Sequence, residues 1–271
     1  MLEIMGTAQN AIASYNVALE AASSNIANMN VLGYKSLDVS FQSILERILS
    51  QGSAATATMG GTNPIQFGQG MSVSSTSIDF SQGSFSQGSG LDLAVNGQGL
   101  FIISTDGGST YRYTRVGNFS VDSAGNLTSN NMQVFGLDGS NSVVPITNLP
   151  SNDKSSYKWL EDGSLQYTTD GGTTYIDTGY KIAMTYFINS SALAAIDGTS
   201  FAETVASGTP ATAIAPGNAA GSVKPGYLEA SNVNYLSETI YASEIQRAMS
   251  SNLSVVQMAS DMISSFISKI G

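Results

Sequence analysis

The chain has 271 residues, of which 42% are hydrophobic and 11% are charged, so it can bury a sizeable core in one large domain or two smaller ones. Its net charge of −10, with only ten Lys and Arg residues, argues against a nucleic-acid partner, which needs clustered positive charge. It has no Cys and no His, which excludes disulfides, thiolate metal sites and a Ser-His-Asp triad.

The N-terminal segment predicts a long amphipathic helix, which we assign to residues 1–33. It shows a seven-residue repeat, and a second repeat is offset from it by three residues; these two series predict the apolar seam of a coiled coil. The helix should end between Met29 and Gly33, where Asn and Gly supply capping chemistry. The first series is Met5, Ile12, Leu19 and Ile26, and the second is Met1, Ala8, Tyr15, Ala22 and Met29.

This segment does not read as a targeting signal. Glu3 stands where a secretory signal would carry Lys or Arg, and no continuous apolar run follows it. No stretch of about 18 apolar residues occurs in the sequence. We therefore expect neither a cleavable signal peptide nor a membrane-embedded helix.

Residues 34–78 predict an extended connecting arm. Gly, Ser and Thr are frequent from Gln51 to Ser77, as in extended linkers. The apolar residues Ile65, Phe67, Met71 and Val73 would anchor this arm, which makes a purely flexible loop a poor description of it.

Residues 79–226 predict a β-rich outer domain, because the apolar period changes from seven to two. Turn signals such as Asn96-Gly97, Asp106-Gly107-Gly108 and Asp170-Gly171-Gly172 separate short alternating runs. Short strands at this spacing predict an antiparallel sandwich or barrel-like domain. Its last part, Ala206 to Lys224, is rich in Ala, Gly, Thr and Pro and reads as a second extended connector.

Residues 227–271 predict a second long helix, preceded by cap candidates from Ser231 to Asn234. A helix over 235–269 would be roughly 50 Å long at 1.5 Å per residue. Its seven-residue series is Tyr235, Ala242, Met249, Val256, Ile263 and Ile270, its offset series is Ile245, Ala259 and Phe266, and Asn252 interrupts the seam.

The fold class is therefore α+β, with the terminal helices pairing as a coiled-coil-like unit and an antiparallel β domain between them. Their outer faces are rich in Ala, Ser, Asn and Met and carry few charges, whereas an exposed helix is usually charged. One interpretation is an intramolecular pair that closes the domain. The other, which the scarcity of charge favours, is a seam that also meets further copies of the chain.

Chemistry-bearing motifs are weak, so we expect no enzyme, cofactor or metal site. A carboxylate-based glycoside hydrolase would need two acids converging in a cleft, but the candidates Glu161, Asp162 and Asp170 sit in turn signals. Asp122 to Asn126 is too short for a Ca²⁺ loop, and Gly97-Gln98-Gly99 precedes a strand rather than a helix. A coiled-coil adhesin is a further alternative, but its ends would not pair within one chain.

Several motifs, in order, resemble the bacterial flagellar rod and hook proteins. Ser24 to Asn30 followed by Gly33-Tyr34-Lys35 resembles the N-terminal signature of that family, in which Asn25 and Asn28 are motif positions. The resemblance continues through Gly60 to Gln66, Gly68 to Met71, Asp79 to Ser84, Leu91 to Phe101, Tyr113 to Phe119 and Gly226 to Val233.

The resemblance implies a structural subunit of a helical homopolymer. The terminal helices of many copies would pack into an inner tube around an export channel, through Met5, Ile12, Leu19, Ile26, Ile245, Met249, Val256, Ile263 and Phe266. The segment with Asn25, Asn28, Gly33, Tyr34 and Lys35 would turn the chain outward. The arm would reach neighbouring subunits through Asn63, Pro64, Ile65 and Phe67.

Within that family the Gly60 to Gln66 arm and the Asp79 to Ser84 run favour a compact flagellar hook protein. A hook is a hollow universal joint that transmits motor torque to the filament. The alternative is a distal-rod protein, which forms the rigid drive shaft of the basal body. Either would be exported by the flagellar export apparatus and would meet neighbouring rod, hook-cap and hook-filament junction proteins.

Overall fold

The structure, a computed structural model, describes residues 2–44, 47–52, 54, 59–63, 65–150, 153–217 and 219–270. The chain divides into two compact units. One, here called the helical unit, comprises Met1–Ile26, Leu37–Ser77 and Tyr235–Gly271. The other, the β unit, comprises Ala27–Ser36 and Ile78–Asn234. Each unit is thus built from segments that are far apart in the sequence.

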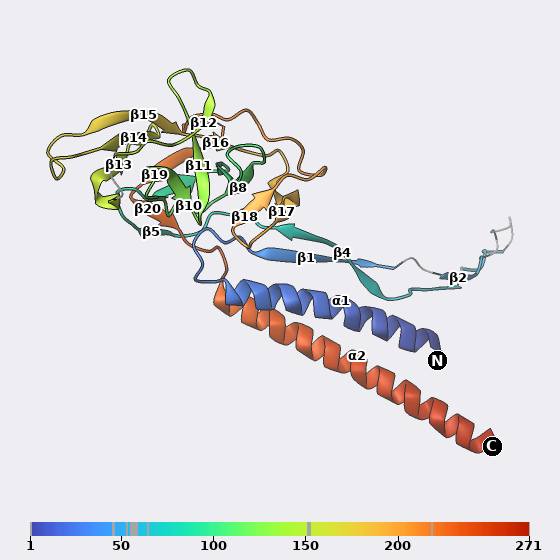
Figure 1. Ribbon diagram of the computed structural model, residues 1–271. Helices are drawn as coiled ribbons and strands as arrows, with labels where there is room; N and C mark the ends of the chain where they lie inside the picture. The colour runs from blue at the N-terminus through green and yellow to red at the C-terminus, as the bar shows by residue number, and fades with distance from the viewer. Residues whose placement is uncertain are drawn as a thin grey trace. The chain divides into compact units, whose positions relative to one another are not determined.

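The helical unit contains the two long helices that the heptad patterns predict. Figure 1 shows α1 (Leu2–Ala27) and α2 (Tyr235–Ile270) side by side. No described helix is long and apolar enough to cross a membrane.

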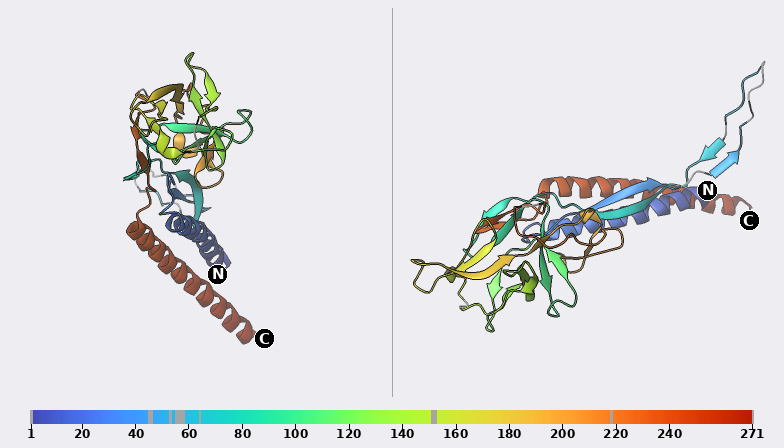
Figure 2. Two further views of the ribbon diagram at one scale, coloured as in Figure 1. Left: turned by 60° about the vertical axis from the view of Figure 1, so that its left-hand side comes forward. Right: turned by 90° about the horizontal axis from the view of Figure 1, so that it is seen from above.

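The predicted arm is more regular than an extended connector. Its strands are β1 (Leu37–Ser43), β2 (Arg47–Ser50), β3 (Ile65–Phe67) and β4 (Met71–Ile78). β1 pairs with β4, and β2 pairs antiparallel with β3. The β1–β4 pair runs beside α1, as the right-hand view of Figure 2 shows.

The β unit is antiparallel, as the alternating pattern predicts. Its main sheet has 12 strands with the central order β13-β14-β15-β11-β7-β8-β18-β17, and all of its described pairings are antiparallel. Two small sheets join distant segments: β19 pairs with β6, and β20 pairs with β5.

The strands and short helices of the β unit have the following bounds: β5 (Phe85–Gln87), β6 (Leu93–Asn96), β7 (Leu100–Ser104), β8 (Arg112–Thr114), β9 (Ser120–Val121), β10 (Leu127–Ser129), β11 (Met132–Leu137), β12 (Val143–Pro145), η1 (Lys154–Ser156), β13 (Tyr157–Trp159), β14 (Ser164–Tyr167), β15 (Ile176–Ile182), β16 (Met184–Thr185), η2 (Ser190–Ala192), β17 (Ala194–Ala195), β18 (Ser200–Ala202), β19 (Ser222–Pro225) and β20 (Tyr227–Glu229).

The core of the β unit is built around its aromatic side chains. Trp159 is fully buried, and its indole N–H donates to the carbonyl of Leu91 over 2.8 Å. Phe119 packs edge-on against both Trp159 and Phe101, with ring centroids 6.1 and 5.2 Å apart. Since such contacts add to apolar burial, Trp159 is a structural residue and reports on the folding of this unit.

Two hairpin loops of the β unit repeat one hydrogen-bond pattern. Between β7 and β8, the Ser104 hydroxyl donates to Asp106 over 2.6 Å and the Thr110 N–H donates over 2.9 Å. Between β14 and β15, the hydroxyls of Thr168 and Thr174 and the Thr174 N–H donate to Asp170. Because these bonds favour the carboxylate, the pKa of Asp106 falls from 3.8 to about 2, and that of Asp170 is also lowered.

The β unit should therefore lose stability in acid. Since the folded-state pKa values lie below 3.8, the unfolded chain binds more protons in this window. The stabilising contribution is present above about pH 4 and is lost as the pH falls through about 2. We expect the midpoint of thermal unfolding, followed by Trp159 fluorescence, to change less between these pH values in an Asp106→Asn/Asp170→Asn variant than in the natural chain. An equal shift in both proteins would show that these loops do not carry the acid sensitivity.

Candidate functional site

The buried face of α1 is made of small residues. Of the predicted seam positions of this helix, Met5, Ile12, Leu19, Ile26 and Tyr15 are only half-buried, whereas Ala8 and Ala22 of the offset series are buried. Because small side chains let other backbone come close, this face suits tight packing. Among the described side chains of α1, the buried ones are Ala8, Ala11, Ser14, Ala18, Ala22 and Asn25.

The backbone at the start of β4 comes close to this face. The Ser14 hydroxyl donates to the carbonyl of Met71 over 3.3 Å. Gly70 has φ +96°, and a Cβ atom there would lie 3.1 Å from the carbonyl oxygen of Thr7. The ring of Tyr15 meets that of Phe41 on β1 edge-on, with centroids 6.1 Å apart. The arm therefore covers part of α1 within the same chain.

The second helix keeps much of its apolar surface exposed. Of its predicted seam residues, Ile245 is buried, Met249, Val256 and Ile263 are half-buried, and Phe266 is exposed. The following apolar side chains of α2 are more than half exposed: Tyr235, Leu236, Ile240, Leu253, Met258, Met262, Phe266 and Ile267. These side chains include Met258, Met262 and Phe266, which follow one another at four-residue intervals on one face of the helix.

An open groove of about 360 Å³ lies where α1 and α2 meet. Ala8, Ala11 and Tyr15 line it from α1, and Asn252 and Val255 line it from α2. The heptad interruption at Asn252 therefore coincides with incomplete helix–helix packing. Its side-chain amide is satisfied within the helix, where it donates to the carbonyl of Ala248 over 3.0 Å.

Asn25 connects three segments of the helical unit. Its side-chain amide accepts from the Leu37 N–H over 2.9 Å and donates to the Leu37 carbonyl over 3.0 Å. The same amide donates to Glu238 on α2 over 3.3 Å. Burial raises the pKa of Glu238, which the bond from Asn25 opposes and the nearby charge of Asp38 reinforces. This motif residue thus joins α1, β1 and α2.

We predict that Asn25→Ala destabilises the helical unit by about 1–3 kcal/mol, because it leaves the backbone groups of Leu37 without these partners. Thermal loss of helical circular dichroism at 222 nm measures the effect. Asn16→Ala, at an exposed position on the same helix, is the control and should change stability by less than about 0.5 kcal/mol. Equal midpoints for the two variants would contradict the prediction.

The remaining motif residues lie in the β unit, at the turn that follows α1. The Asn28 carbonyl accepts from the Val31 N–H over 3.0 Å, and the Gly33 N–H donates to the Glu229 carbonyl over 2.8 Å. Gly33 has φ +66°, and a Cβ atom there would lie 2.9 Å from the backbone of Arg115. Tyr34 is only 3% exposed. The turn therefore needs glycine for both its conformation and its packing.

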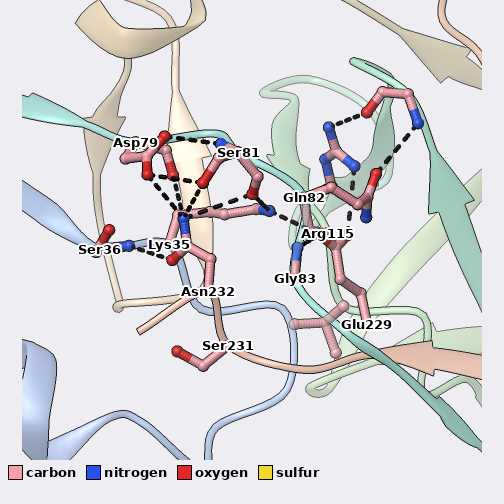
Figure 3. A network of polar contacts seen from close by, with 12 residues as sticks. Lys35, Ser36, Asp79, Ser81, Gln82, Gly83, Arg115, Glu229, Ser231 and Asn232 are labelled. Atoms are coloured by element: carbon pink, nitrogen blue, oxygen red, sulfur yellow. Dashed lines mark hydrogen bonds and ion pairs between the residues drawn. The ribbon is translucent and has the colours of Figure 1, made fainter. Parts of the chain in front are cut away.

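A cluster of buried charges follows this turn; the charge cluster is defined as Lys35, Arg115 and Glu229 (Figure 3). Lys35 Nζ donates to Glu229 Oε1 over 2.7 Å and to the Ser81 carbonyl over 2.6 Å. Arg115 Nη1 donates to Glu229 Oε2 over 3.3 Å, and its Nη2 donates to the Gly97 carbonyl over 2.6 Å. The three side chains are at most 1% exposed, so water screens these charges little.

Burial dominates the acid–base behaviour of the two cations. Desolvation lowers the pKa of Lys35, and the carboxylate of Glu229 partly opposes that shift. Desolvation also lowers the pKa of Arg115, again opposed by Glu229. Glu229 therefore favours the charged form of both cations.

Beside the charge cluster lies a second set of polar contacts, here called the outer network and formed by Ser36, Asp79, Ser81 and Asn232 (Figure 3). The Ser36 N–H donates to Asn232 Oδ1 over 2.8 Å, and the Asn232 amide donates to the Asp79 carbonyl over 2.8 Å. The Asp79 N–H donates to the Ser36 carbonyl over 2.9 Å.

The predicted arm contacts lie in the helical unit. Asn63 and Ile65 are exposed, Ile65 by 55%. Phe67 ends β3, and its backbone pairs with that of Arg47. Pro64 lies outside the described residues, as do the seam position Met1 and the side chain of Ile270. The described arm residues thus leave apolar surface open, as a contact with another chain requires.

Sequence reasoning found Lys35 but missed its partners Arg115 and Glu229 and the outer network. Arg115 lies in the Tyr113 to Phe119 run, and Glu229 and Asn232 lie in the Gly226 to Val233 run, which were noted only for their resemblance. Because the chain has so few charges, the presence of Glu229 and Arg115 inside apolar motifs was the sequence feature that could have indicated a buried ion pair. Their pairing joins positions that are far apart in sequence, which periodicity does not reveal.

The structure offers little for catalysis. Among the described residues, no group of three or more acidic side chains could hold a metal ion. Asp122, Asp162 and Asp170 accept hydrogen bonds within their own turns rather than converging in a cleft. The two units instead offer separate features: the helical unit has exposed apolar side chains on α2, and the β unit has the buried charge cluster.

Three family models match successive parts of the chain. Residues 5–35 match "Flagella basal body rod protein", residues 94–148 match "Flagellar hook protein FlgE/F/G D1 domain", and residues 224–270 match "Flagellar basal body rod FlgEFG protein C-terminal". The first and third cover the segments that carry Lys35 and Glu229.

Relatives match along nearly the whole chain. The flagellar basal-body rod protein FlgG of Bacillus subtilis is 32% identical over 270 residues, covering 98% of this chain and 98% of the relative. FlgG of Caulobacter vibrioides is 32% identical over 266 residues, covering 97% of each. The flagellar hook protein FlgE of Helicobacter mustelae is 39% identical over 133 residues, covering 48% of this chain but 29% of the relative.

Proposed function

The chain belongs to the bacterial flagellar basal-body rod and hook protein family, and from this premise we propose that it is a distal-rod subunit, a structural protein of the rigid drive shaft. The observation that supports the rod is end-to-end similarity to FlgG proteins, at 97% or more of both chains. The hook relative matches over 29% of its own length. The comparisons therefore support the rod better than the hook, which the arm motifs had favoured.

We propose that copies assemble through their helical units. The apolar side chains of α2 are exposed well beyond what α1 and the arm cover, which leaves surface for neighbouring copies. The small-residue face of α1 and the half-buried Met5, Ile12, Leu19 and Ile26 would add to the packing. In this arrangement the helical units form the inner tube, the β units form its outer layer, and the arm reaches adjacent subunits through Asn63 and Ile65.

Such a subunit transmits torque rather than catalysing a reaction. Its partners would be further copies of itself and the other flagellar axial proteins that adjoin the rod, and the export apparatus would deliver it to the basal body. Because the surfaces offered on α1 and α2 differ, the contact between copies is heterologous. Contacts of this kind build open helical assemblies when the rotation between successive copies does not close a ring.

Electron microscopy of the purified protein after polymerisation tests the proposal. Straight, rigid tubes with a central channel are the expected result. Curved or supercoiled tubes would overturn the rod in favour of the hook. A folded particle that stays monomeric up to the highest soluble concentration, with both helices formed, would overturn both.

A further inference from the structure

We infer that the charge cluster of Lys35, Arg115 and Glu229 fixes the positions at which the chain passes between the β unit and the helical unit. This role concerns a single chain and holds for a rod or a hook alike. The chain enters the β unit at Ala27 and leaves it after Ser36. It enters the β unit again at Ile78 and leaves it after Asn234. The exits after Ser36 and Asn234 and the re-entry at Ile78 lie within two residues of a member of the outer network, and the segment that begins at Ala27 reaches the cluster at Lys35.

The first passage is held by Glu229 and Asn232. After α1, the Gly33 N–H donates to the Glu229 carbonyl and Lys35 donates to the Glu229 carboxylate. The Ser36 N–H, at the exit into the arm, donates to Asn232. The departing chain is therefore bound by three successive contacts to the segment that leads into α2.

The returning arm is held by the same groups. The Asp79 N–H donates to the Ser36 carbonyl, and the Ser81 carbonyl accepts from Lys35. The Gly83 N–H donates to Glu229 Oε1 over 3.0 Å. A Cβ atom on Gly83 would lie 2.1 Å from the Ala230 carbonyl oxygen, so these two segments are in direct contact. Glu229 thus binds the outgoing arm, the returning arm and Arg115 at once.

Charged groups suit this task because their hydrogen bonds are directional. A segment in the wrong position would lose those bonds, at a cost in stability. Apolar packing has no preferred register, whereas each cation here has its acceptors at fixed points. A shift of one segment by one residue would leave a charge buried without its partner. Replacing a buried ion cluster by apolar residues of similar volume is often neutral or stabilising, so the cluster's distinct contribution is the position it enforces.

The test replaces the whole cluster with apolar side chains in the full chain, as Lys35→Met/Arg115→Leu/Glu229→Leu. Amide hydrogen exchange is the readout. We expect the amides of Gly33, Ser36 and Asp79 to lose protection by about tenfold or more, while Ile103 and Val134, paired in the core sheet, keep theirs. Unchanged protection at Gly33, Ser36 and Asp79 would overturn the inference.

The matched control is the exposed ion pair of the same unit, Lys181 with Asp162, which lies 3.1 Å apart with side chains 45% and 55% exposed. Lys181→Met/Asp162→Leu should leave all of these amides unchanged. A loss of protection as large as in the cluster variant would show that the effect is not specific to the cluster, and would overturn the inference.

A milder variant guards against simple unfolding. Lys35→Met/Arg115→Met/Glu229→Gln removes all three charges with little change in volume, so no buried charge is left without its partner. Because the natural chain has no Cys, spin labels at Asn30→Cys and Ser84→Cys report the distance between the first passage and the returning arm. We expect a broader distance distribution in this variant, with core amide protection retained. An unchanged distribution, or a loss of core protection in both variants, would overturn the inference.

Discussion

Replacing Met258, Met262 and Phe266 together with Gln will prevent assembly at concentrations where the natural chain forms tubes. These side chains lie at four-residue intervals on one face of α2 and are 57%, 51% and 62% exposed. If a neighbouring copy covers them, their burial contributes about 2–5 kcal/mol per subunit contact. Losing that contribution weakens association by a factor of roughly 30 to 5,000.

Sedimentation over a concentration series, with electron microscopy of the pellets, measures this effect. Met258→Leu/Met262→Leu/Phe266→Leu is the matched control, because it alters the same positions and keeps them apolar. It should assemble nearly as the natural chain does. Tubes from the Gln variant at an unchanged critical concentration would place the subunit contact on another surface.

Glu229→Ala should destabilise the β unit by about 3–5 kcal/mol, since it leaves the buried cations of Lys35 and Arg115 without their anion. That is a large share of the 5–15 kcal/mol that typically separates folded from unfolded domains. Denaturant unfolding followed by Trp159, the only tryptophan and a core residue, measures the change directly. Lys181→Ala, which removes only the exposed cation paired with Asp162, should cost less than about 1 kcal/mol.

The pH dependence of stability in the Glu229→Ala variant distinguishes the loss of the ion pairs from the loss of packing. Burial already lowers the pKa of Lys35 below 10.5, and removing Glu229 takes away the group that opposes this shift. Between the folded-state pKa and 10.5 the unfolded chain binds more protons, so stability rises with pH. The loss of stability in the variant, relative to the natural chain, should therefore be largest below the folded-state pKa of Lys35. It should shrink as the pH approaches 10.5. A constant deficit would indicate lost packing instead.

These two predictions concern different properties of the molecule. The α2 substitutions test whether the exposed helix surface joins copies, which is the proposed function. Glu229→Ala tests a buried contact within one chain, whose loss would cost stability whether or not copies assemble. A variant that folds normally but does not assemble, beside one that fails to fold, would show that assembly surface and internal cluster are separate features.

The sequence by itself determined the fold class and the family. A period of seven at both ends and a period of two between them are local properties of the chain, and so are the Asp-Gly and Asn-Gly turns. They predicted α1, α2 and the antiparallel β domain because burial of one face requires those spacings. The ordered motifs from Ser24 to Val233 indicated the flagellar rod and hook proteins, although they favoured the hook over the rod.

The tertiary structure decided which residues are buried and which meet. Of the two heptad series on α1, Met5, Ile12, Leu19 and Ile26 are only half-buried, whereas the small residues from Ala8 to Ala22 lie deepest, because the paired arm packs on α1 where side chains are short. The cluster of Lys35, Arg115 and Glu229 joins positions separated by up to 194 residues. Periodicity reports only the neighbours of a residue along its own helix or strand, so such a contact exists only once the chain has folded.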